Sequence, residues 1–132
     1  MVKRPRVLVI DDDPVFNATV KAILENKDYE VISALSGDEG LEKARTGRPD
    51  IILLDIIMPA KDGFSVCEQI KDDPELAEVP VLILTSFARD KSKTNIPVSA
   101  GLGLEAEGYI DKPVNAPDLL REVERLLEKA GR

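Results

Sequence analysis

The sequence predicts an open parallel β-sheet with helices on both faces. Three runs, Val7–Ile10, Ile51–Leu54 and Val81–Leu84, contain only apolar residues, which is typical of strands buried on both sides. The first two are each followed by a segment whose apolar residues recur at helical spacing. Strands that alternate with helices favour a parallel sheet with right-handed crossovers. In such a sheet, ligands bind beyond the carboxyl ends of the strands.

Capping residues predict where the first two helices begin and end. Asp13 suits an N-cap and Pro14 the first position of a helix, which Asp28 and Tyr29 then interrupt. Ser36, with a glutamate three residues later, has the pattern of a capping box, and Gly47 is expected to be the C-cap of that second helix.

Five strands and four regular helices are expected in the chain. The strands are Val7–Ile10, Glu30–Ala34, Ile51–Leu54, Val81–Leu84 and Gly108–Ile110. The third helix runs through Phe64, Cys67 and Ile70 and ends before Pro74, and the last begins after Asn115.

The segment between the fourth and fifth strands has an atypical sequence. It contains Pro97 and two glycines, which disfavour a helix, and its polar stretch has no apolar face to pack on the sheet. We expect a loop from about Ala88 to Ser99 and at most a short helix over Leu102–Glu107. A helix between the fourth and fifth strands would therefore be short or irregular.

Composition narrows the possible functions. The length of 132 residues predicts a single domain over residues 1–132, with no output domain. Against 25 acidic residues there are only 18 lysines and arginines, so a general nucleic-acid binder is disfavoured. No apolar run approaches membrane length, and the lone cysteine, Cys67, indicates a reducing compartment; we expect no membrane insertion and a cytoplasmic location. Histidine, the commonest general base, is absent.

Polar residues that follow the predicted strands should meet at one edge of the sheet. Asp11 and Asp12 follow the first strand, Asp55 the third, Thr85 the fourth and Lys112 the fifth. Three adjacent carboxylates repel one another unless a cation intervenes, and Mg²⁺ prefers such oxygen ligands. A carboxylate surrounded by a metal ion, an ammonium and a hydroxyl is equipped to accept a phosphoryl group.

The motifs at these strand ends resemble the receiver domain of two-component response regulators. The matching runs are VLVIDDDP from Val7, LLDIIMPAKDG from Leu53, LTS from Leu84 and YIDKP from Tyr109. The resemblance covers nearly the whole chain. It implies a flavodoxin-like, doubly wound five-stranded sheet in the order 2-1-3-4-5.

The resemblance also implies a role for each acidic residue of the site. Asp55 matches the phosphoacceptor, and Asp12 matches the direct Mg²⁺ ligand. Asp11 matches the acid that usually reaches the metal through water, and the backbone carbonyl of Ile57 matches the remaining protein ligand.

The resemblance also implies which residues respond to phosphorylation and which kinds of partner the domain has. Thr85 and Lys112 match the residues that contact the phosphoryl group, and Tyr109 matches an aromatic whose rotamer follows them. The peptide bond between Lys112 and Pro113 matches one that is often cis. The implied partners are a sensor histidine kinase or phosphotransfer protein and a downstream protein target, without direct nucleic-acid binding. The only reactions implied are the domain's own phosphorylation and dephosphorylation, so it is not expected to be an enzyme.

Two alternatives from other function classes remain open. A haloacid-dehalogenase-like phosphatase would use Asp11 as nucleophile and Asp13 as acid, with Thr85 and a lysine in its later motifs. However, no late acidic pair follows another strand, the chain is short for a cap domain, and Asp55 would be unexplained. A receiver-fold docking module that takes no phosphate is the second alternative, and the complete set of site residues argues against it.

Overall fold

A parallel sheet of five strands forms the centre of the molecule. The computed structural model describes residues 4–56, 63–85 and 106–131. The strands are β1 (Arg6–Ile10), β2 (Glu30–Ala34), β3 (Ile51–Asp55), β4 (Val81–Thr85) and β5 (Gly108–Asp111). They pair in parallel in the order β2-β1-β3-β4-β5, which confirms the predicted topology. All five carboxyl ends therefore lie at one edge.

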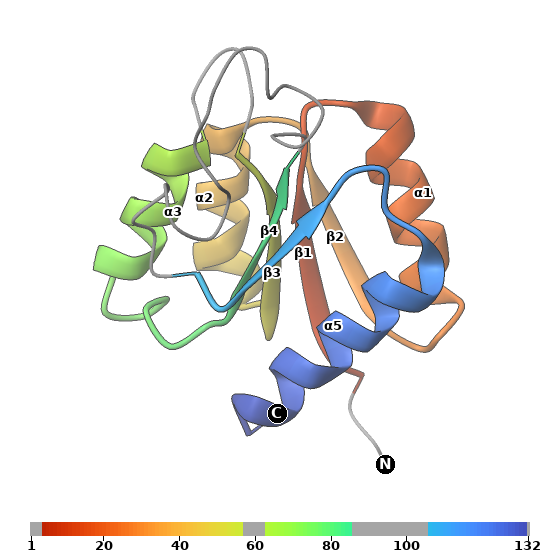
Figure 1. Cartoon of the computed structure of the whole chain (residues 1–132). Coiled ribbons are helices and arrows are strands. Elements are labelled where there is room, and N and C mark those ends of the chain that lie inside the picture. The colour runs from red at the N-terminus through yellow and green to blue at the C-terminus, as the bar shows by residue number, and fades with distance from the viewer. Residues whose placement is uncertain (1–3, 57–62, 86–105, 132) are drawn as a thin grey trace.

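Helices cover both faces of this sheet. The described helices are α1 (Pro14–Glu25), α2 (Gly37–Gly47), α3 (Gly63–Asp72) and α5 (Ala116–Lys129). Figure 1 shows α1 and α5 on one face and α2 and α3 on the other. The predicted loop over Ala88–Ser99 and most of the short helix predicted over Leu102–Glu107 lie outside the described residues.

The all-apolar strands are buried on both sides, as their sequence predicts. On β1, Leu8 and Ile10 pack with α2 and α3, whereas Val7 and Val9 pack with α1 and α5. The same alternation holds for β3 and β4. Fully burying one such side chain contributes about 1.5 to 3 kcal/mol, so these two layers hold the strand ends in fixed positions.

The predicted N-caps are present. Asp13 Oδ1 accepts a hydrogen bond from the backbone N–H of Val15 at 2.9 Å, and Ser36 Oγ accepts one from the N–H of Glu39 at 3.1 Å. In an ordinary capping box, the Glu39 carboxylate would accept a hydrogen bond from the N–H of the N-cap residue itself. Here it accepts one from the N–H of Leu35, the residue before the N-cap, at 2.7 Å.

The predicted C-cap of α2 is wrong by one residue. Gly47 is the last residue of the helix, and Arg48 is the C-cap, with a left-handed φ of 47°. Arg48 precedes Pro49, and a residue before proline is disfavoured in the helical region. A Cβ on Gly47 would lie 2.7 Å from the side-chain end of Ile32, so the flexible end of that side chain would have to shift.

Candidate functional site

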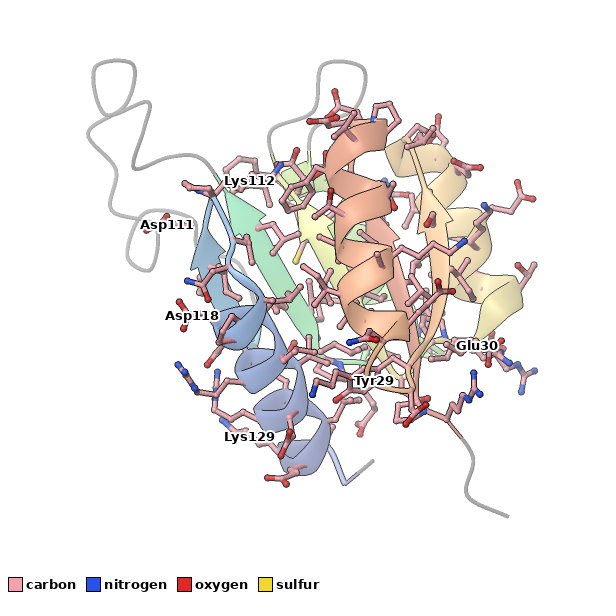
Figure 2. All side chains as sticks on the ribbon, turned by 90° about the vertical axis from the view of Figure 1, so that its right-hand side faces the viewer. Tyr29, Glu30, Asp111, Lys112, Asp118 and Lys129 are labelled. Atoms are coloured by element: carbon pink, nitrogen blue, oxygen red, sulfur yellow. The ribbon has the colours of Figure 1, made fainter. Side chains whose placement is uncertain are left out.

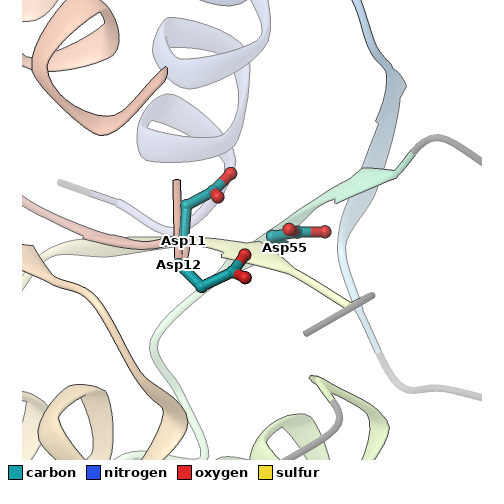
Figure 3. A group of neighbouring side chains, drawn as sticks. All are labelled: Asp11, Asp12 and Asp55. Carbon is teal, nitrogen blue, oxygen red and sulfur yellow. The ribbon is translucent and has the colours of Figure 1, made fainter. Parts of the chain in front are cut away.

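Three carboxylates gather at the edge where the strands end. One ligand oxygen from each of Asp11, Asp12 and Asp55 lies within 4.8 Å of the others (Figure 3). Residues Ile10 of β1 and Leu54 of β3 are register partners, so the acids that follow them emerge side by side. Asp11 is fully buried and Asp55 is 5% exposed, whereas Asp12 is exposed to solvent.

The ammonium of Lys112 partly neutralises this cluster. Its Nζ lies 2.7 Å from Asp11 Oδ2 and 3.4 Å from Asp55 Oδ2. Figure 2 shows Lys112 just beyond the end of β5, at the same edge of the sheet. Burial acts to lower the pKa of Lys112, but the hydrogen bond to Asp11 and the charge of Asp55 outweigh it and raise the pKa. The peptide bond between Lys112 and Pro113 is cis, as expected.

The turn between β1 and α1 holds Asp11 firmly in place. Asp11 Oδ1 accepts from the backbone N–H of Asp13 at 2.9 Å, and the Asp11 carbonyl accepts from Asn17 Nδ2 at 3.2 Å. Asn17 Nδ2 also donates to the carbonyl of Ala34 at 3.0 Å, which ties α1 to the end of β2. Asn17 was not predicted as a site residue. Its position as a polar residue between the apolar positions Phe16 and Val20 of α1 was the available signal in the sequence.

Gly63 lets α3 begin close to the end of β3. Its N–H donates to the carbonyl of Ile56 at 3.0 Å. A Cβ at Gly63 would lie 2.6 Å from the backbone oxygen of Asp55, closer than a side-chain carbon can approach. Any side chain at position 63 would therefore force the backbone of Asp55 or of α3 to move.

The remaining predicted site residues are Thr85, Tyr109 and Ile57. Thr85 ends β4 and is the register partner of Asp111. Tyr109 on β5 is half-buried and packs with the core on the α2 and α3 side. Burial raises the pKa of its phenol, with smaller contributions from Cys67 and Glu107. Ile57, the predicted carbonyl ligand, lies outside the described residues. The structure thus brings together Asp11, Asp12, Asp55 and Lys112.

Comparison with known proteins places the chain in a family. A profile described as the response regulator receiver domain matches residues 7–124. The chain belongs to this family. Receiver domains take part in two-component signalling, in which they interact with histidine kinases and downstream effectors, and they are usually not classical enzymes. Neither the phosphatase nor the docking-module alternative gains support from the comparisons.

Individual relatives agree with this membership. The chain is 36% identical over 128 residues to the DNA-binding dual master transcriptional regulator RpaA of Synechocystis, covering 97% of this chain and 51% of that protein. It is 33% identical over 122 residues to protein PilH of Pseudomonas aeruginosa, covering 92% of this chain and 97% of that one. The chain thus spans about half the length of RpaA but nearly all of PilH.

A solved structure supports the same fold. The receiver domain of the sensor histidine kinase PA1611 from Pseudomonas aeruginosa, with a magnesium ion coordinated in its active site cleft, superposes with a TM-score of 0.82. It is 25% identical to this chain, and the match covers 96% of this chain and 99% of that one. Among the described residues, none of the helices has the length and apolar character that crossing a membrane requires.

Proposed function

We propose that this receiver accepts a phosphoryl group on the Asp55 carboxylate from a sensor histidine kinase or phosphotransfer protein, and that it then signals to a downstream protein. One observation carries the proposal. The Asp55 carboxylate lies at the sheet edge within reach of two further acids and of one ammonium, a set that suits phosphoryl transfer.

The donor set suits Mg²⁺. Among the described residues, three carboxylates and the ammonium of Lys112 give this group a formal charge of −2, and hard dications take such oxygen ligands. Asp12 is exposed and has no hydrogen bond or ion pair within the described residues, so its oxygens are available as a direct ligand. Both oxygens of Asp11 already accept hydrogen bonds, from Asp13 and Lys112, which favours contact with the ion through water. We propose the carbonyl of Ile57 as a further ligand.

Each residue then has a defined part in the transfer. An oxygen of Asp55 forms a bond to phosphorus while the bond from phosphorus to the donor's imidazole nitrogen breaks. When bound, Mg²⁺ supplies positive charge that offsets the charge on the phosphoryl oxygens. Lys112, now 3.4 Å from Asp55, exchanges this carboxylate for a phosphoryl oxygen. We propose that Thr85 donates to the same group and that Tyr109 responds to this rearrangement.

Signalling follows as a shift between two conformations of the domain. Beyond its own phosphorylation and dephosphorylation, the domain needs no catalytic activity for this function. The buried thiol of Cys67 is compatible with a reducing compartment, and we propose that the receiver acts in the cytoplasm.

Chemical labelling tests the phosphoacceptor. The protein is incubated with acetyl phosphate or phosphoramidate in the presence of Mg²⁺ or EDTA, and the modified residue is located by mass spectrometry. We expect Mg²⁺-dependent label on Asp55 and none in Asp55→Asn, whose amide has nearly the same shape but is a poor nucleophile. Circular dichroism of Asp55→Asn controls for folding.

The location of the label separates the proposal from its competitors. Label on Asp11 would indicate the dehalogenase-like phosphatase, and a folded protein without label would indicate a docking module. Equal labelling of wild type and Asp55→Asn would also refute the assignment of Asp55.

A further inference from the structure

The ammonium of Lys112 has a third partner, the ring of Phe16. Its Nζ lies 4.2 Å from the ring centroid, within the range of a cation–π interaction. Phe16 belongs to the first turn of α1 and is half-buried on the side of the core shared with α5. The spacing of apolar residues in α1 predicts Phe16 only as a core residue, so its contact with the site is additional.

The three partners of the ammonium differ in what phosphoryl transfer does to them. Asp11 and Asp55 are the other two, and under the proposed function both become engaged by the metal ion or the phosphoryl group. A neutral ring face is no ligand for a hard dication, which takes oxygen donors. Of the partners in the described part of the chain, only the ring is contacted by neither the metal ion nor the phosphoryl group.

We propose that Phe16 is a positioning residue for phosphoryl transfer, which holds the Lys112 ammonium beside Asp55 while the metal ion and the phosphoryl group compete for its carboxylate partners. This inference rests on the proposed function. It assigns to α1 a part in the reaction that a carboxylate could not fill, because a carboxylate at position 16 would itself compete for Mg²⁺.

The first turn of α1 fixes the ring relative to the acids. Asp13 Oδ1 accepts hydrogen bonds from the N–H groups of Val15 at 2.9 Å and Phe16 at 3.4 Å. The N–H of Asp13 in turn donates to Asp11 Oδ1 at 2.9 Å. A continuous set of hydrogen bonds therefore connects Asp11 with the backbone of Phe16 and fixes the position from which the ring extends.

Fluorinated phenylalanines test the proposal without removing the ring. Stepwise fluorination at position 16 weakens the negative face of the ring while nearly preserving its shape. The initial rate of Asp55 labelling by subsaturating acetyl phosphate is measured at saturating Mg²⁺ for mono-, di- and trifluoro variants. We expect the rate to fall with each fluorine, reaching a loss of roughly threefold to tenfold, the range of a partly desolvated cation–π contact. Phe16→Leu should lose as much, with thermal unfolding measured to control for packing.

The same series in a Lys112→Ala background separates positioning from packing. If Phe16 acts through the ammonium, fluorination there should leave the residual rate unchanged. An equal decline in both backgrounds, or no decline in the wild-type background, would overturn the role of Phe16 while leaving Asp55 labelling intact. Absence of Asp55 label in the unmodified protein would instead overturn the proposed function, and this inference with it.

Discussion

Replacing Asp12 by asparagine should stabilise the metal-free protein and remove its stabilisation by Mg²⁺. Asp12 is the exposed member of the acidic cluster and lacks a hydrogen bond or ion pair among the described residues. Its removal therefore breaks no hydrogen bond or ion pair with the described residues, and it relieves repulsion. The amide of asparagine keeps the size of the side chain but is a weaker ligand for a hard dication.

The expected size follows from the geometry of the cluster. A separation of up to 4.8 Å gives about 0.9 kcal/mol of repulsion for each pair of charges in a water-like dielectric, which suits an exposed group. Two such pairs give about 1.7 kcal/mol, of which about 1 kcal/mol remains once Lys112 and salt offset part of the repulsion. With an unfolding entropy of about 2.1 cal/mol/K for each residue, the melting temperature should rise by about 4 °C.

Magnesium should stabilise the wild type but have little effect on Asp12→Asn. At a free Mg²⁺ concentration about ten times Kd, mass action stabilises the wild type by about 1.4 kcal/mol, or about 5 °C. Asp12→Asn should show little of this rise. Thermal unfolding is followed by circular dichroism in EDTA and in a Mg²⁺ titration. Glu78→Gln removes one exposed charge away from the cluster and serves as the matched control.

Two results would refute this reasoning. A melting temperature of Asp12→Asn in EDTA at or below that of the wild type would show that the three acids do not repel one another as their positions require. A Mg²⁺-dependent rise as large as that of the wild type would place the metal elsewhere.

Three further predictions concern other parts of the structure. Gly63→Ala should lower the free energy of unfolding by about 1 to 3 kcal/mol, because the added carbon meets backbone atoms at the end of β3. Gly47→Ala, whose added carbon meets only the end of a flexible side chain, should cost less in the same denaturant titration. The hydrogen bond from the N–H of Leu35 is the main cause that lowers the pKa of Glu39. The stabilisation of the fold by the Glu39 carboxylate should therefore be present above pH 4.5 and lost as the pH falls through the folded-state pKa. At pH 7, Glu39→Gln should accordingly be less stable than the wild type by less than about 1 kcal/mol and melt at a lower temperature. Near pH 3 the two proteins should melt at the same temperature. Lys112→Ala should reduce the NMR shift changes on phosphorylation more than the final extent of labelling, and unchanged shifts would exclude a switch role for this lysine.

Local chemistry determined most of the elements of this protein. The all-apolar runs indicated strands buried on both faces, and Asp13 and Ser36 marked helix starts that the structure confirms. These features depend on neighbours within a few residues, so they can be predicted without knowledge of the fold. The strand order followed from the resemblance of the motifs to receiver domains, since periodicity alone does not order strands.

The end of α2 shows where local reasoning failed. Gly47 was the obvious residue for a C-cap, but Pro49 displaces the left-handed position to Arg48. The close neighbour of Gly47 is instead the side-chain end of Ile32 on β2, which lies against it only in the folded chain.

The composition of the acidic edge was determined by the sequence, but its contacts were decided by tertiary structure. Acids at the ends of two strands must meet if the strands are parallel neighbours, and this could be predicted. The contact of Lys112 with Asp11 joins residues 101 positions apart, and its contact with the ring of Phe16 depends on how α1 packs. Distances of a few ångströms between such groups are set by sheet register and by helix packing, to which residues along the whole chain contribute. Sequence therefore names the groups at this edge, and only the packed fold determines which of them touch.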